Sequence, residues 1–380
     1  MFAGIYARGA VAPAVSGAAW LQAMLDAEAA LARACAQEGL IGAEAAEAIA
    51  GACRAECFDA AELGEESARH ASPVIPLVAA LRAAVGAEHA AAVHLGATSQ
   101  DILDTAAMLV LRRALAPLLE DAGAAASAAA ALAERHRATP MAGRTLLQQA
   151  LPTAFGLRAA GWMAGIDEAR TALEQVRDRG AAVQMGGPVG TRAPAVGAHV
   201  ADALGLAAPL LPWHTDRTRP AAAAAALGVL AGVLGKIARD VTLLAQDEIG
   251  ELREGGAPAR GRSSAMAHKR NPVAAVSVLA CTKRAPGLVA TMLACMEQEH
   301  ERAAGAWQAE PGVLSELLTL TGSAAAWARE LLENLEVDAG RMAENLARLA
   351  GAGVEPAADP GRHLGAASEL IDRALAAHLP

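Results

Sequence analysis

Residues 261–272, GRSSAMAHKRNP, gather two serines, a histidine and several cations within an otherwise alanine-rich chain. Asn271 and Pro272 are a good helix start, with asparagine as N-cap and proline in the first turn, so capping explains Asn271. Capping leaves the serines and the run His268–Arg270 unexplained. Adjacent cations repel one another, so this segment, here called the serine loop, is either an exposed flexible loop or a site for an anionic partner. Glycines at 255, 256 and 261 would give it the mobility of a lid.

A second polar cluster, HLGATSQDILDT at residues 94–105, is here called the TSQD segment. Thr98 and Asp101 have the spacing of a capping box, which predicts a helix start. A helix N-terminus with unpaired N–H groups is also a ready carboxylate site. Ser99 is surplus to capping, which needs one hydroxyl, so both interpretations of this segment stay open.

A third cluster, GRTLLQQALPTAFG at residues 143–156, is here called the RTLLQQ segment. Arg144, Thr145 and Gln148 precede Pro152, which would lie one turn into a helix. The segment is therefore either a solvated loop that leads into a helix or a third source of polar ligands.

The elements that must position these clusters are helices nearly throughout, because apolar residues recur at helical spacing and nothing alternates convincingly with period two. The pattern predicts an all-α fold with no major sheet: a central bundle of long antiparallel helices, shared between subunits. We expect an N-terminal helical domain at 1–104, the bundle at 105–345 and a short C-terminal helical domain at 346–380. Expected helices cover 18–38, 43–57, 73–85, 99–137, 150–179, 218–253, 272–301 with a break near Pro286, and 312–335.

Composition excludes several classes of function. The net charge of −9 and an aromatic content of 2% argue against a nucleic-acid partner, which needs a basic surface and stacking rings. The apolar stretch 220–235 is mostly alanine and glycine between Arg219 and Lys236, so we interpret it as a tightly packed bundle helix and expect no membrane partner. Five cysteines without paired spacing, and no evident export signal, favour the cytoplasm. Cys53 and Cys57 lack a second Cys/His pair for zinc.

In this order and at these separations, the three clusters resemble the aspartase/fumarase superfamily, which includes adenylosuccinate and argininosuccinate lyases. The serine loop is similar to its GSSxMPxKxNP motif, and the other two segments to its TSxD and RTHxQxAxPxT regions. The similarity runs from LQAMLDAEAALARA to GRHLGAASELIDRAL, although Arg262 and Ala267 depart from the loop motif and the C-terminal part looks short. Within the superfamily, GATSQDILDTA, LPWHTDR and QDEIGEL are most similar to the cycloisomerase branch.

Leu146 favours that branch on chemical grounds, because it stands where the lyases carry a histidine. Expelling an amine or water benefits from a general acid. A lactonising enzyme instead uses the substrate's own carboxylate, which is ionised at neutral pH and needs neither base nor acid. The resemblance thus implies conversion of 3-carboxy-cis,cis-muconate to 4-carboxymuconolactone, in aromatic-acid breakdown through protocatechuate.

The resemblance also implies roles for particular residues. Ser263 would be the acid/base, ahead of Ser264, and Lys269 and Asn271 would stabilise an aci-carboxylate intermediate. It further implies a small tricarboxylate substrate, no metal or organic cofactor, and a homotetramer whose sites each draw on three subunits. The expected substrate-binding residues are Thr98, Ser99, Arg144, Thr145, Gln148, Ser264, Met266, His214 and Arg217.

Two other functions stay open. One is a lyase of the adenylosuccinate or argininosuccinate kind that releases fumarate, against which Leu146 speaks. The other is a non-catalytic helical oligomer, which Arg262 and Ala267 support.

Overall fold

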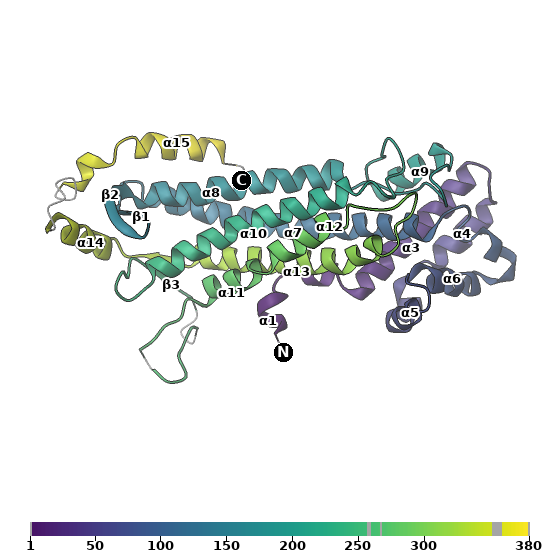
Figure 1. The fold of residues 1–380 in the computed structure, drawn as a ribbon, viewed down its shortest axis with the longest axis horizontal. Coiled ribbons are helices and arrows are strands. Elements are labelled where there is room, and N and C mark those ends of the chain that lie inside the picture. The colour runs from purple at the N-terminus through teal and green to yellow at the C-terminus, as the bar shows by residue number, and fades with distance from the viewer. Residues whose placement is uncertain (1, 257–259, 267, 352–358, 379–380) are drawn as a thin grey trace.

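The computed structural model describes residues 2–256, 260–266, 268–351 and 359–378, and it is an elongated, all-α protein (Figure 1). Four long helices run along its length and confirm the predicted central bundle. They are α7 (Ser99–Arg135), α8 (Phe155–Gln175), α10 (Thr218–Leu244) and α13 (Ala306–Glu333).

Shorter elements cover the two ends of this bundle. At one end lie α3 (Gly17–Gln37), α4 (Ala43–Ala52), α5 (Ala60–Ser67), α6 (Val74–His89) and α9 (Pro194–Leu204). The opposite end carries β1 (Pro140–Thr145), β2 (Gln148–Ala154), β3 (Leu252–Glu254), β4 (Leu335–Val337) and α14 (Ala339–Gly351). The remaining helices are α1 (Ala3–Tyr6), α2 (Val11–Ala14), α11 (Val273–Thr282), α12 (Ala285–Ala294) and α15 (Ala367–Ala377), with short turns at Ala55–Cys57, Ala90–Ala92, Val176–Gly180 and Pro360–His363.

The longest helix, α7, starts where its capping box predicts. The Asp101 carboxylate accepts a hydrogen bond from the Thr98 backbone N–H at 3.1 Å. Small and branched apolar side chains then follow on its buried faces, and the helix packs against α3, α8 and α13. At 37 residues it is about 55 Å long. This length sets the distance between the two ends of the molecule.

One hydrophobic core connects the bundle to the N-terminal helices, with buried side chains from Val11 to Ile371. The division into domains at residues 104 and 345 therefore stays a prediction. Three helical stretches, Val74–Ala92, Thr218–Leu244 and Val273–Ala294, are long and apolar enough to cross a membrane. In the fold, α10 instead packs against α8, α11, α12 and α13.

Several predicted helices are too long: the one expected at 43–57 ends at Ala52, and the one expected at 272–301 ends at Ala294. Residues 150–154 belong to strand β2, which pairs with β1 in an antiparallel hairpin. The hairpin loop is Leu146–Leu147, with φ of +50° and +64°, the geometry of a two-residue type I′ turn. The helix expected to reach residue 253 ends at Leu244, and Gly250, at φ +62°, redirects the chain into β3. The break near Pro286 is confirmed, since α11 ends at Thr282 and α12 begins at Ala285.

Candidate active site

The serine loop is closed by its own hydrogen bonds. The Gly261 carbonyl accepts from the Asn271 backbone N–H at 2.8 Å and from the Asn271 side-chain amide at 3.1 Å. Gly261 is at φ +67°, and a Cβ there would lie 2.3 Å from the Asn271 carbonyl oxygen, so only glycine fits. Arg262 and Arg270 form the next bridge of this short ladder. These contacts hold the two ends of the serine loop together.

Within the loop, the Ser263 hydroxyl oxygen accepts from the backbone N–H groups of Ala265 at 3.2 Å and Met266 at 3.1 Å. Two N–H donors aimed at one oxygen stabilise negative charge on it. Ser263 is half-buried, whereas Ser264 and Met266 are exposed. The geometry therefore favours Ser263 as the serine that gives or takes a proton.

The cations of the loop face solvent. The side chains of Arg262, His268, Lys269 and Arg270 are exposed. This keeps Lys269 accessible to an anionic substrate, while its backbone N–H donates to the Met266 carbonyl at 3.2 Å.

The predicted cap by Asn271 is wrong. Pro272, with ψ of +78°, precedes α11, and the helix receives its cap from a distant residue. The Glu254 carboxylate accepts from the N–H groups of Ala274 at 3.0 Å and Ala275 at 2.8 Å. Asn271 is instead engaged with Gly261 across the loop.

The RTLLQQ segment lies in the β1–β2 hairpin. Thr145 and Gln148 pair across its turn and are exposed, and the Leu146 side chain is 97% exposed. Arg144 points back into the molecule, where its guanidinium makes a bidentate ion pair with Glu251 at 2.7 and 2.9 Å. Asn345 of α14 donates to the same carboxylate at 2.8 Å. Arg144 therefore fastens the hairpin to the start of β3.

In the TSQD segment, Thr98 and Ser99 stand at the N-terminus of α7 and Asp101 is fully buried below them. The Asp101 carboxylate also accepts from the backbone N–H groups of Gly186 at 2.9 Å and Gly187 at 2.8 Å. The capping carboxylate thus ties the helix start to a glycine loop, and leaves Thr98 and Ser99 at its edge.

His214 and Arg217 are buried in a network of ionisable groups. His214 Nε2 lies 2.6 Å from the Asp101 carboxylate. Arg217 pairs with Asp104 at 2.8 Å and with Glu310 at 2.5 Å. These contacts make His214 and Arg217 supports for the α7 N-terminus, not exposed ligands.

Burial and charge act in opposite directions in this network. Burial disfavours the Arg217 cation, but the Asp104 and Glu310 carboxylates outweigh it and raise the pKa of Arg217 above its usual value. Burial raises the pKa of Glu310, and Arg217 only partly offsets this. Two carboxylates thus share one buried guanidinium.

Sequence reasoning missed the acidic partners. Glu251 pairs with Arg144 of the hairpin, Glu254 caps α11, and Glu310 pairs with Arg217. Glu251 lies within QDEIGEL, a string that resembles the cycloisomerase branch. Nothing in its spacing indicates a partner more than 100 residues away.

A single chain does not bring the three clusters together. The TSQD segment lies at one end of α7, and the hairpin with the RTLLQQ segment lies beyond the other end (Figure 1). The serine loop leaves the bundle between β3 and α11, on the hairpin side. Thr98 and Arg144 are thus separated by roughly the length of a 37-residue helix, about 55 Å.

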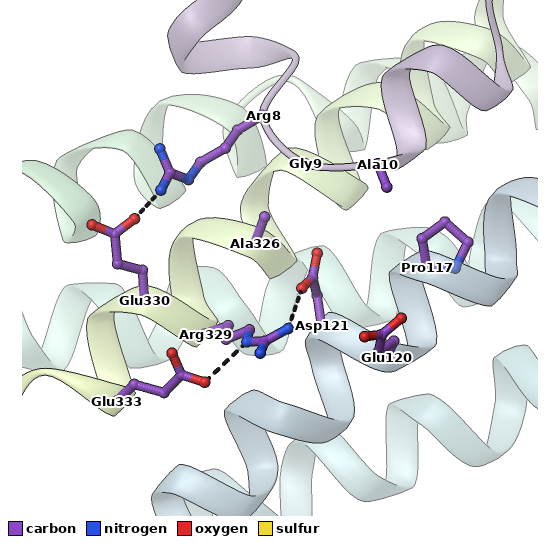
Figure 2. Close-up of a pocket in the computed structure, with 10 residues that line it drawn as sticks. All are labelled: Arg8, Gly9, Ala10, Pro117, Glu120, Asp121, Ala326, Arg329, Glu330 and Glu333. Carbon is purple, nitrogen blue, oxygen red and sulfur yellow. Dashed lines mark hydrogen bonds and ion pairs between the residues drawn. The ribbon is translucent and has the colours of Figure 1, made fainter.

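One cavity lies elsewhere. It has a volume of about 610 Å³ and lies between the N-terminal segment, α7 and α13 (Figure 2). No candidate site residue lines it. Its ion pairs join Arg329 to Asp121 and Glu333, and Arg8 to Glu330. Among the described residues, no group of three histidine, cysteine or acidic side chains could hold a metal ion.

Comparison with known proteins identifies the family. A family described as lyase matches residues 14–287. The chain is 49% identical over 335 residues to a 3-carboxy-cis,cis-muconate cycloisomerase of Pseudomonas aeruginosa, covering 86% of this chain and 73% of that one. It is 47% identical over 353 residues to a nitrosuccinate lyase of Streptomyces davaonensis, covering 88% and 74%.

The fold is similar to that of solved relatives. A 3-carboxy-cis,cis-muconate lactonizing enzyme from Pseudomonas putida matches with a TM-score of 0.92 and 36% identity over 100% of this chain and 98% of that one. With the family match over residues 14–287, this similarity shows that the chain belongs to the lyase family of the aspartase/fumarase superfamily.

Proposed function

We infer that this chain is an intramolecular lyase that converts 3-carboxy-cis,cis-muconate to 4-carboxymuconolactone, in the breakdown of aromatic acids through protocatechuate. Relatives that are 49% and 43% identical to it over 335 residues carry the cycloisomerase name. The observation that carries the proposal is the hydrogen-bonded Ser263 oxygen in a cationic loop, combined with a leucine where the superfamily's lyases carry histidine. In this set Ser263 would supply the proton, and Leu146 replaces the histidine that could protonate a leaving group.

In the proposed reaction, one substrate carboxylate oxygen forms a bond to a carbon of the conjugated diene. The displaced electron pair moves into a second carboxylate, which becomes an aci-carboxylate. The Ser263 hydroxyl then gives its proton to carbon and regains one from solvent, so one proton is taken up as a carboxylate becomes the lactone ester, and the free acids of substrate and product are isomers. The N–H groups of Ala265 and Met266 stabilise the serine oxygen when it has lost its proton.

Lys269 and Asn271 would stabilise the aci-carboxylate, since negative charge grows there during the reaction. Thr98, Ser99, Thr145 and Gln148, with Ser264 and Met266 of the loop, would contact the remaining carboxylates. Arg144 would act through its ion pair with Glu251 by fixing the hairpin. We do not retain substrate binding for His214 and Arg217, because both are buried in ion pairs.

We further propose that the active site is assembled from three subunits of a homotetramer. The separation of the TSQD and RTLLQQ segments along α7 supports this, because one chain cannot place them on one small substrate. The exposed leucines of the hairpin turn also suit burial against another copy. A cytoplasmic location is proposed from the five free cysteines.

The direct test is addition of purified protein to 3-carboxy-cis,cis-muconate while the ultraviolet absorbance of the conjugated diene is followed. The absorbance should fall with the wild type. The shared site is tested by mixing inactive Ser263→Ala and Thr98→Ala variants after dissociation. If a site takes these residues from different subunits, random reassembly should restore about a quarter of wild-type activity. Loss of diene without restoration would retain the reaction but reject the shared site.

A second candidate is a lyase that acts on nitrosuccinate, favoured by the relative at 47% identity. Elimination from nitrosuccinate would release nitrite, a stable anion that also needs no general acid, so Leu146 does not separate the two reactions. Nitrite release, measured by a colorimetric assay beside the diene assay, distinguishes them.

A further inference from the structure

The serine loop is held at its base by a carboxylate outside the loop. Glu254 is the last residue of β3, and its side chain caps α11, the helix that follows the loop. One carboxylate therefore links the end of β3 to the start of α11, the two elements on either side of the serine loop. Its side chain is only 7% exposed, so water competes little for these hydrogen bonds.

A cluster of charged groups surrounds this carboxylate. Arg260 Nε lies 3.9 Å from the Glu254 carboxylate, and the Arg260 guanidinium also pairs with Glu330 of α13. Glu330 pairs in turn with Arg8 of the N-terminal segment (Figure 2). Both arginines lie over the ring of Trp327, at 4.0 Å for Arg8 and 5.5 Å for Arg260. We call these five residues the base cluster.

Three members of the base cluster lie on regular elements, Glu254 on β3 and both Trp327 and Glu330 on α13. Glu254 is opposite Leu335 in the β3–β4 ladder, and the Gly255 N–H donates to the Asn334 carbonyl at 2.9 Å. On the other side, the Trp327 indole N–H donates to the Ile5 carbonyl at 3.0 Å. The start of the loop is thereby fixed to α13 and to the N-terminal segment.

Ser263 is three residues from Arg260 and two from the Gly261–Asn271 closure. The exposed cations of the loop repel one another, which favours spreading of the loop. The base cluster opposes this spreading, because the hydrogen bonds of Glu254 to Ala274 and Ala275 keep the start of α11 beside the end of β3. The Glu254 carboxylate also occupies the N-terminus of α11. A substrate carboxylate therefore cannot bind at that end of the helix.

We propose that Glu254 is a positioning residue for the reaction. It sets where Ser263 stands by joining β3 to α11, the elements that flank the serine loop, and Arg260 and Glu330 reinforce it. This inference rests on the proposed function for its kinetic consequence, but not for its structural one. Glu254 itself contacts no substrate in this proposal.

The experiment compares Glu254→Ala, Glu254→Gln and Glu254→Asp with Asp59→Ala. Asp59 is a matched control, because its carboxylate caps α5 through the N–H groups of Ala61 and Glu62, far from the loop. We expect Glu254→Ala to lower kcat by about 10- to 100-fold with KM within about threefold, since a displacement of about 1 Å suffices for such a loss. Glu254→Asp should recover part of kcat, and Asp59→Ala should stay within about twofold of wild type.

A second readout does not depend on substrate. Amide hydrogen exchange of residues 261–275 should be faster in Glu254→Ala and intermediate in Glu254→Gln, with no change there in Asp59→Ala. Unchanged kcat overturns the positioning role, and so does a lower kcat with unchanged exchange. If Glu254→Ala does not fold, the milder Gln and Asp variants decide. A wild type without cycloisomerase activity would reject the proposed function, while the exchange result would still show whether Glu254 holds the loop.

Discussion

The serine loop and the His214–Arg217 network contain the same kinds of cationic residue, but these residues are exposed in the loop and buried in the network. In the loop, cations are exposed and the Ser263 oxygen receives two backbone hydrogen bonds. In the network, Arg217 is 3% exposed and each of its donors faces a carboxylate or a carbonyl. In sequence both are short polar strings near a helix start.

The difference shows which charges are available for chemistry. A buried guanidinium shared by two carboxylates is already neutralised, and removing it would leave unpaired buried charge. An exposed cation beside others of its kind is stabilised by an incoming anion. We therefore expect mutations in the loop to change rate, and mutations in the network to change stability.

Among such mutations, Ser263→Ala should have the largest effect, a loss of kcat. Loss of a general acid/base is expected to lower kcat by about 10³- to 10⁴-fold, with little change in the free energy of unfolding, because the loop is largely exposed. The diene absorbance assay measures it. Ser264→Ala is the matched control and should cost less than about tenfold. The assignment would be reversed if Ser264→Ala had the larger effect.

Arg217→Ala tests the buried His214–Arg217 network. Breaking the buried pairs is expected to lower the free energy of unfolding by about 3–5 kcal/mol, because Asp104 and Glu310 lose their shared cation. Denaturant unfolding measures this loss. Arg33→Ala is the control: its pair with Glu47 is exposed, and such pairs contribute about 0–1 kcal/mol. Equal losses in both variants would contradict the importance of burial.

Much of the fold was predictable because local signals agree with it. Helix α7 begins at its capping box, and α3, at Gly17–Gln37, matches the helix expected at 18–38. The β1–β2 hairpin was missed because its turn is Leu146–Leu147, which has none of the asparagine or glycine typical of type I′ geometry. The contacts that hold the hairpin come from its strands, through the Arg144–Glu251 ion pair and the packing of β1 on α14.

The candidate site was only partly predictable, because its supports are long-range. Nothing near Arg144 in sequence indicates that Glu251 will pair with it. Although Asn271-Pro272 signals a cap, the cap comes from Glu254, 20 residues before Ala274, whose N–H donates to it. Polar type and spacing identified the three clusters. Which side chain faces solvent depends on elements that lie more than a hundred residues apart.

Glu310→Gln should sharpen the comparison through pH. Burial raises the pKa of Glu310 above its ordinary value of 4.5, so the folded protein binds a proton more tightly there than the unfolded chain. Wild-type stability from this group is then present at low pH and is lost as pH rises from 4.5 through the raised pKa. Unfolding curves measured across pH should show the free energy of unfolding of the variant rising relative to that of the wild type over that window. A difference in free energy of unfolding that does not change with pH would contradict the raised pKa of Glu310.

The smallest effect is expected from Leu146→His, which restores the histidine of the lyases on the exposed hairpin turn. Histidine tolerates the positive φ of this position better than leucine, so stability should change by less than about 0.5 kcal/mol. If the nucleophile and leaving group are carboxylates, an added acid has nothing to protonate, and cycloisomerase kcat should stay within about threefold. A large gain would mean that proton transfer at this site limits the reaction, whereas a large loss would place Leu146 against substrate or another subunit.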